Sequence, residues 1–167
     1  IAIPAPGPGR VQYALQAAGP YLIWKESRGQ FGDQVDLRAL DTRTNHLIFV
    51  ADVKGEGSDP SASGSLVVWQ HVAACAPDCG TNDILGKDLA TGASYTIATG
   101  LSDRTAPVVS GRRVAWQTTS DTELWLKDID TGALMRVAAL PPYGGTYLTY
   151  PVLTDRYLAW ILWEPRT

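Results

Sequence analysis

The residue types that most often carry out chemistry are scarce in this chain. Its 167 residues include two cysteines, Cys75 and Cys79, in the stretch CAPDC, and two histidines, His46 and His71. A zinc site needs about four ligands at suitable spacing, and no second cysteine pair is present. We therefore expect a small loop disulfide between Cys75 and Cys79, with two reduced surface thiols as the alternative. A disulfide would place the protein outside the cytoplasm, extracellular or at the cell surface, with the bacterial periplasm as an alternative location.

Sequence motifs for catalysis are also missing. The chain has no G-x-S-x-G nucleophile elbow, no H-E-x-x-H and no phosphate-binding glycine loop. The acid-rich stretch DCGTND, residues 78–83, offers oxygen ligands, but it lacks the glycine-centred spacing of an EF-hand calcium loop. We expect it to be a surface loop. The sequence accordingly predicts no catalytic residues, no metal, no cofactor and a non-enzymatic function.

The net charge of the chain argues against two classes of binding partner. Fourteen Lys and Arg stand against 17 Asp and Glu, which gives a net charge of -3, and the pI is about 5.3. Nucleic acids and anionic membranes both favour a basic face, so neither is expected as a partner. No apolar run approaches the roughly 18 residues of a membrane span. The chain does not begin with Met, and we expect either a mature form without its leader or a piece of something longer.

Four similar stretches imply a repeated structural unit. They are AGPYLIWK (18–25), SGSLVVWQ (63–70), SGRRVAWQ (110–117) and TDRYLAWI (154–161). Their tryptophans, which lie 45, 47 and 44 residues apart, are Trp24, Trp69, Trp116 and Trp160. A period of this length is typical of solenoids, propellers and arrays. We expect these rings to fill the space between stacked repeats, where burial of each contributes about 2–3 kcal/mol.

Each unit contains the signals of four short strands. One strand precedes a Gly or Asp turn, a second is an apolar run that ends in Trp, and a third leads into an Asp turn such as DLATG (88–92) or DIDTG (128–132). The fourth strand follows that turn. Turn positions expected at positive φ are Gly64, Gly92, Gly111 and Gly132, with Asn45 in the first unit. Four antiparallel strands per repeat predict an all-β fold, a β-propeller with four-stranded blades.

The strands predicted from the sequence are too few to close a ring of complete blades. After an extended N-terminal arm (1–9), the repeats span about 10–54, 55–102 and 103–147, and residues 148–167 supply only half of a fourth. An apolar open sheet edge is a template for another strand. Three explanations stay open: a fragment of a longer propeller, closure by the chain's own N-terminus, or completion by a neighbouring subunit.

The repeat motifs are similar to those of a known group of propellers. The pattern P-x-x-S-G-x-x-V-x-W occurs at 60–69 and 107–116, and K-D-h-x-T-G occurs at 87–92 and 127–132. Together they resemble the TolB-type, WD-repeat-like β-propeller repeats of bacterial envelope and secreted proteins, over residues 15–167. The first turn is Ser-Gly here, where such repeats often carry Asp-Gly. The resemblance implies partner binding, assembly at the cell envelope, or a propeller attached to an enzyme domain.

These observations lead to a structural function as the first hypothesis. Subunits would associate through the incomplete last blade, into an extracellular filament or another homopolymer. The expected interface places Ile1 and Ile3 of the arm beside Tyr157, Leu158, Trp160, Ile161 and Trp163. Further aromatic residues, Tyr143, Tyr147 and Tyr150, strengthen this region as a protein–protein face. The alternatives are a TolB-type module that binds a protein or glycan partner in the cell envelope, and a fragment of a larger propeller attached to a hydrolase.

Overall fold

The chain folds into stacked antiparallel sheets. A computed structural model describes residues 3–27, 34–54, 59–72, 81–102, 107–118, 122–141 and 145–164. Within these ranges there are fourteen strands and no helix. Ile1, Tyr143 and both cysteines lie outside the described residues. No helix in the described part is long and apolar enough to cross a membrane.

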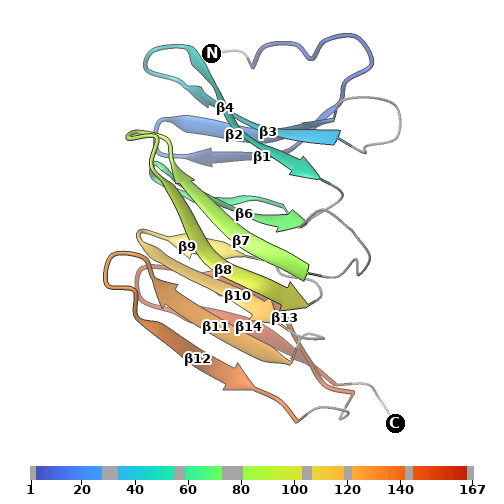
Figure 1. Cartoon of the computed structure of the whole chain (residues 1–167), viewed down its shortest axis with the longest axis vertical. Helices are drawn as coiled ribbons and strands as arrows, with labels where there is room; N and C mark the ends of the chain where they lie inside the picture. Colours follow the sequence, from blue (N-terminus) through green and yellow to red (C-terminus); the bar gives the residue numbers. More distant parts are fainter. Residues whose placement is uncertain are drawn as a thin grey trace.

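Three sheets have four strands each, and their strands follow chain order. The first blade is β1 (Gln12–Ala18), β2 (Tyr21–Ser27), β3 (Gln34–Asp41) and β4 (His46–Lys54). The second blade is β5 (Ser61–Ser63), β6 (Leu66–Val72), β7 (Thr81–Asp88) and β8 (Ser94–Ser102). The third blade is β9 (Val108–Ser110), β10 (Arg113–Thr118), β11 (Glu123–Asp128) and β12 (Leu134–Ala139). The half-blade has only β13 (Tyr147–Leu153) and β14 (Leu158–Trp163). Figure 1 shows the sheets stacked one after another along the molecule.

This arrangement confirms the predicted all-β propeller with three complete blades and half of a fourth. The second strand of each complete unit is longer than predicted, because it does not stop at the tryptophan. β2 and β6 continue for three residues beyond Trp24 and Trp69, and β10 continues for two beyond Trp116. The extra length carries polar residues of the first two blades, Glu26 and His71 among them, toward one edge of the stack.

The turns have the backbone conformation that their residue types favour. Gly64, Gly92, Gly111 and Gly132 lie at φ of +60°, +78°, +58° and +73°, and Asn45 takes the same place at +57°. Residues with a Cβ rarely adopt this region, and Asn is among the few that tolerate it.

The aspartates that begin two of these turns stabilise the turn backbone by accepting hydrogen bonds from it. The Asp88 carboxylate accepts the N–H of Ala90 at 2.9 Å, and the Asp128 carboxylate accepts the N–H of Thr131 at 2.9 Å. The shared K-D-h-x-T-G motif is therefore explained by turn geometry rather than by chemistry.

The tryptophans hold neighbouring blades together. Trp69 is 5% exposed and belongs to one core cluster with Ile23 and Leu37 of the first blade. Trp116 is 3% exposed and shares a second cluster with Val68 and Ile84 of the second blade. In each case the ring lies on the face that its blade turns toward the preceding blade. The core is therefore a series of similar inter-blade layers.

Lysines of the repeat motif connect each blade to the outer strand of the preceding one. Lys127 Nζ donates a hydrogen bond to the carbonyl of Ile97 on β8 at 2.8 Å. Lys87 Nζ donates to the carbonyl of Phe49 on β4 at 3.4 Å. The two bonds join equivalent strands, so this lysine has a packing role that the sequence pattern alone did not reveal.

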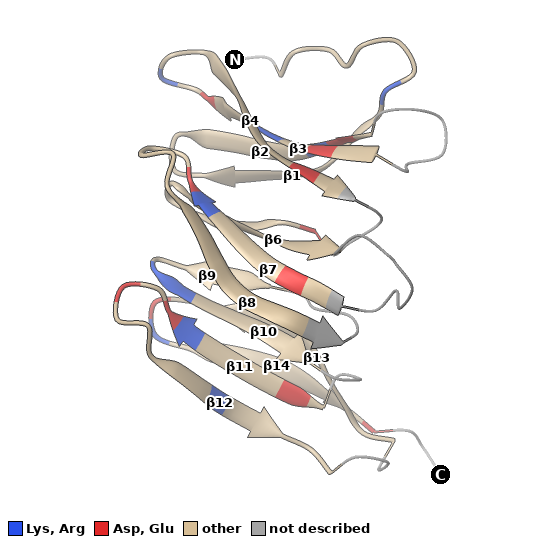
Figure 2. Cartoon of the chain, viewed as in Figure 1, with Lys and Arg blue, Asp and Glu red and all other residues tan. Residues whose placement is uncertain are grey.

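Serines make the corresponding connection between inner strands. Ser61 Oγ accepts the N–H of Val109 at 3.1 Å, and Ser63 Oγ accepts the N–H of Gly111 at 2.9 Å. The charged side chains as a whole mark no single surface. Figure 2 shows Lys, Arg, Asp and Glu scattered over several blades rather than gathered in one patch of the visible face.

Candidate functional site: the open half-blade

The half-blade is a well-defined hairpin with an unpaired outer edge. β13 and β14 pair antiparallel, with Tyr147 opposite Trp163 and Thr149 opposite Ile161. The Thr154 side chain closes the turn, because its Oγ1 accepts the N–H of Tyr157 at 2.9 Å. In each other blade a third strand pairs with the second one. Within the described residues, no third strand pairs with β14.

The third blade holds the hairpin in place through its backbone. The Gln117 side-chain amide donates to the carbonyl of Leu148, and the Arg113 guanidinium donates to the carbonyls of Thr154, at 3.1 Å, and Asp155. Leu148 is only 1% exposed as a result of this packing. The inner strand of the half-blade is thus part of the stack, and the outer strand is presented on a fixed base.

The face that the half-blade turns away from the third blade is apolar and exposed. Because Leu148 packs inward, strand alternation places its neighbour Tyr147 on the other face, together with Ile161 and Trp163. These three side chains are 38%, 56% and 52% exposed. The rings of Tyr147 and Trp163 are 5.6 Å apart. We call this surface of Tyr147, Ile161 and Trp163 the open face.

Trp160 departs from the buried position predicted for the repeat tryptophans. It is 38% exposed, whereas Trp24 is 1% exposed. The reason is the missing third strand. Trp69 is flanked by Leu85 on β7 and Trp116 by Trp125 on β11, but β14 has no such neighbour in the described residues. The ring of Trp160 is therefore available to a strand that adds at this edge.

The other predicted interface residues divide between the two ends of the molecule. Tyr157 is 72% exposed in the turn of the half-blade, and Leu158 is half-buried. Ile3 is half-buried, in the arm. The arm lies at the end formed by the first blade, away from the half-blade (Figure 1). The described part of the arm therefore does not occupy the edge of β14 in this structure.

Potential catalytic and metal-binding residues are dispersed. His46 is exposed at the start of β4, and His71 is half-buried near the end of β6. In the described ranges, no three His, Cys, Asp or Glu residues come together in a way that could hold a metal ion. The predicted disulfide of Cys75 and Cys79 falls outside the described residues and stays a prediction. Trp125 serves packing, since its Nε1 donates to Glu123 at 3.0 Å.

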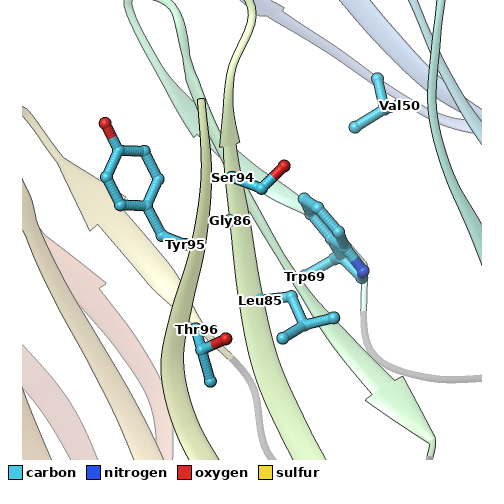
Figure 3. A pocket seen from close by; sticks show the side chains of 7 residues that line it. All are labelled: Val50, Trp69, Leu85, Gly86, Ser94, Tyr95 and Thr96. Carbon is cyan, nitrogen blue, oxygen red and sulfur yellow. The ribbon is translucent and has the colours of Figure 1, made fainter. Parts of the chain in front are cut away.

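A small hollow lies between the outer strands of the first and second blades. Its volume is about 230 Å³, and Val50 faces the ring of Trp69 across it, with Ser94 beside that ring (Figure 3). It forms because Ser94 and Thr96 are small residues. Ligand sites usually enclose about 300–1,000 Å³. The hollow is therefore a weaker candidate than the open face.

The positions of Ser94 and Thr96 point to two exposed apolar residues that the sequence analysis missed. Their counterparts in the first blade are Leu47 and Phe49, which are 39% and 51% exposed. Phe49 pairs with Arg38, which in turn pairs with Trp24, so Phe49 shares the face of Trp24. The sequence contained a signal for them, because Leu47 and Phe49 follow the Asp turn of the first unit at the same spacing as Ser94 and Thr96 follow that of the second.

The face that bears Trp24 is turned away from the second blade. Ile23 packs toward the second blade, so its neighbour Trp24 points the opposite way, on the same face as Glu26 and Arg38. Glu26 forms an ion pair with Arg10, the residue that follows the arm. The distance from Arg10 Nη1 to Glu26 Oε1 is 2.6 Å. Burial raises the pKa of Glu26, but hydrogen bonds and the nearby guanidinium groups outweigh this and lower it below its ordinary value. The beginning of the chain is thus attached to the Trp24 face.

Comparisons with known proteins support the fold and leave the activity open. No protein-family model matches the chain, and no curated protein matches it. Among solved structures, it is similar to the β-propeller domain of the Trilobed protease from Pyrococcus furiosus, whose topology is described as open velcro. The TM-score is 0.60 at 11% identity, and the match covers 96% of this chain and 56% of that one. The chain therefore spans about half the length of this propeller domain.

A second solved structure comes from a study of two prolyl endopeptidases and their inter-domain dynamics. Its TM-score is 0.43 at 9% identity, with 93% of this chain and 32% of that chain covered. The likeness to the first structure, at 11% identity, concerns the propeller fold alone.

Proposed function

We propose that this chain is a non-enzymatic assembly protein that acts outside the cytoplasm, and that a second copy of the chain completes its half-blade. The observation that carries the proposal is the open face together with the unpaired edge of β14. Tyr147, Ile161 and Trp163 are exposed on one hairpin that has two strands in the described residues, where the other blades have four. Monomeric proteins seldom leave such a surface uncovered.

Both main-chain and side-chain terms favour completion of the blade. A strand that pairs with β14 gains main-chain hydrogen bonds along the edge, as in other cases of strand addition. Full burial of a large apolar side chain contributes about 1.5–3 kcal/mol, and about half of that remains to be gained for each side chain of the open face. The sum over three such side chains and Trp160 is of the order of several kcal/mol, which adds to the main-chain hydrogen bonds in offsetting the entropy cost of association.

The N-terminal arm of the neighbour is the segment that we propose as donor, with Ile1 and Ile3 inserted beside β14. Prolines occupy every second position of the arm, at 4, 6 and 8. Alternate residues of a strand direct their N–H groups to the same edge, so the prolines remove donors from one edge and leave the other intact. Such an arm pairs on one side only. It would therefore end the sheet rather than extend it.

Size measurement across a concentration series tests this proposal. Wild-type chain is followed by light scattering after size-exclusion chromatography and by negative-stain electron microscopy, beside a chain without residues 1–9 and an Ile161→Glu variant. Leu134→Glu is the matched control, because Leu134 on β12 is also 56% exposed but lies outside the half-blade. We expect oligomers or fibres from the wild type and the control, and monomers from the other two. A wild-type chain that stays monomeric at all concentrations overturns the proposal.

Two other functions stay as alternative proposals. One is a TolB-type module that binds an envelope protein or glycan, and the other is a propeller portion attached to a hydrolase. The likeness to a protease's propeller domain supports these no further than it supports any propeller. A monomeric wild-type chain in the experiment above would make the first alternative the next one to test.

A further inference from the structure

The chain uses one kind of inter-blade interface twice. The second blade packs its Trp69 face on the first blade, and the third blade packs its Trp116 face on the second. Each complete blade thus has a tryptophan face for the blade before it and an aliphatic face for the blade after it. The interface is directional, because the two faces are different surfaces.

The two ends of the stack bear the unused halves of this same interface. The first blade has its Trp24 face turned outward, with Leu47 and Phe49 exposed on it. The half-blade has its open face turned outward, with Ile161 and Trp163 exposed. Within the described residues, one end therefore exposes Leu47 and Phe49 beside the buried Trp24 with no blade packed on them, and the other end exposes the half-blade with no further blade packed on it.

Resting on the proposed assembly, we propose that the second copy docks head to tail, with its Trp24 face packed on the open face of the preceding subunit. The occupant is another copy of this chain, because the contact continues an interface that the chain already makes within itself. A contact between two different surfaces propagates, and it yields a closed ring or an open filament. A contact between two identical surfaces would stop at a dimer.

The place of the arm in the repeat agrees with this arrangement. Residues 2–6 precede Gly19 by the same distance as 47–51 precede Gly64 and 94–98 precede Gly111. The latter two segments lie on β4 and β8, the outer strands of their blades. The arm therefore stands at the chain position of the outer strand of a preceding blade. When two subunits dock, the arm lies on the side of the neighbour's half-blade where the edge of β14 is unpaired, and it adds there in the place of a third strand.

The arm is held on its own subunit in this structure. Arg10 contacts Glu26 at 2.6 Å, and the Gln12 side chain donates to the carbonyl of Pro4 at 2.9 Å. Release of the arm does not leave the Glu26 carboxylate alone, because Arg38 stays within 3.6 Å of it. The Trp24 face can thus change from the arm to a neighbouring subunit without an unpaired buried charge.

The contact between subunits differs from the internal ones in one respect. Lys87 and Lys127 reinforce the internal interfaces, but Leu40 occupies this position in the first blade and is 1% exposed. The contact between subunits therefore depends on apolar burial and the arm, without the lysine hydrogen bond.

A pair of complementary variants tests the direction of docking. Phe49→Glu blocks the Trp24 face, and Ile161→Glu blocks the open face; both side chains are more than half exposed, so the fold is retained. Each variant alone lacks one half of every contact, and we expect monomers from each. In an equimolar mixture the intact open face of the first variant meets the intact Trp24 face of the second. Native mass spectrometry should then show particles of two chains, one of each variant, and nothing larger.

The outcomes of this experiment distinguish head-to-tail docking from the proposed completion of the half-blade, on which it rests. If Phe49→Glu assembles like the wild type, or if the mixture stays monomeric while the wild type assembles, head-to-tail docking is wrong and blade completion stands. If the wild type does not assemble, blade completion itself is wrong. The milder pair Phe49→Ser and Ile161→Ser, with far-ultraviolet circular dichroism on every sample, covers the case in which a glutamate variant unfolds. The serine pair should give the same one-to-one complex, because that contact joins the two intact faces. Each serine variant alone should assemble only at about tenfold higher concentration than the wild type, which corresponds to a loss of about 1.4 kcal/mol per contact.

Discussion

Arg10 and Glu26 form a 2.6 Å ion pair that attaches the start of the chain to the first blade. The Glu26 side chain is 8% exposed, and Gln12 donates a second hydrogen bond to it at 3.3 Å. This carboxylate lies on the face of Trp24, which no other blade covers in the described chain. Glu26 therefore connects the start of the chain to the outer face of the stack.

The attachment of the arm should depend on pH. The pKa of Glu26 is lowered from its ordinary value of 4.5 in the folded chain, so the carboxylate stabilises the folded state above that value. This contribution is lost as the pH falls through the lowered pKa. We expect the amide resonances of Ile3, Ala5 and Gly7 to shift toward free-peptide positions as the pH drops below 4.5 in an NMR titration. A Glu26→Gln variant should show the shifted positions at neutral pH, and resonances that do not move in the wild type would contradict the assignment.

Loss of the Arg10 side chain should accelerate assembly. The arm must leave its own subunit before it can pair with another, so Arg10→Gln removes a restraint on the exchanged segment. We expect a shorter lag, by a factor of about 2 to 5, if the partly buried pair contributes about 0.5–1 kcal/mol to holding the arm. Light scattering after dilution from denaturant measures the lag. Arg156→Gln is the control, since Arg156 also pairs with a carboxylate, that of Asp155, but lies in the turn of the half-blade.

The result for Arg10→Gln shows whether Arg10 restrains the arm on its own subunit or stabilises the assembled state. If the variant assembles more slowly than the wild type, Arg10 supports the assembled state instead of restraining it. If Arg10→Gln and Arg156→Gln change the lag equally, the effect is one of net charge rather than of the ion pair.

Lys127 should contribute more to stability than Lys87, although the two occupy equivalent positions. The Lys127 bond to the Ile97 carbonyl is 2.8 Å and partly buried, and the Lys87 bond to the Phe49 carbonyl is 3.4 Å and exposed. We expect Lys127→Met to lower the free energy of unfolding by about 1 kcal/mol, and Lys87→Met by a few tenths. Urea unfolding followed by tryptophan fluorescence measures both. Equal effects would show that the hydrogen bonds are not the source of the difference.

The sequence predicted the parts of the fold that repeat. The spacing of the four tryptophans and the Asp turns indicated the blade as the unit, and the positive φ of Asn45 follows the same rule as that of Gly92. Local chemistry decides these features, so a short stretch contains enough information. The burial of Trp69 and Trp116 also follows from their positions, because each has a complete blade in front of it and a further sheet behind it.

The parts that could not be predicted depend on which blade neighbours which. Trp24 and Trp160 have the same local sequence signals, yet one is 1% and the other 38% exposed. Their difference arises from β3, which flanks Trp24, whereas no third strand flanks Trp160 in the described residues. The ion pair of Arg10 and Glu26 joins residues that are 16 apart in the chain, which no local pattern links. The exposed Phe49 could not be told from other apolar strand residues until its face was known.

The close fit of Gly86 within the second blade gives a prediction about packing. Its backbone is outside the positive-φ region, so any cost of a side chain there comes from space rather than from strain. A Cβ at this position would lie 3.1 Å from Cδ1 of Ile97 and 3.4 Å from the carbonyl oxygen of Val67 and from Cγ1 of Val68. We expect Gly86→Ala to lower the free energy of unfolding by about 1–3 kcal/mol.

A second substitution identifies the source of that cost. Ile97→Val removes the Cδ1 atom that the new methyl group meets, and alone it should cost about 0.5–1.5 kcal/mol. The double variant should then be more stable than the sum of the two single effects by at least about 0.5 kcal/mol, because the methyl group added at position 86 occupies part of the vacated space. Some cost should remain, since the carbonyl of Val67 is backbone and cannot move aside as a side chain can. Strictly additive effects in urea unfolding would mean that Ile97 is not the obstacle and that the strand itself shifts.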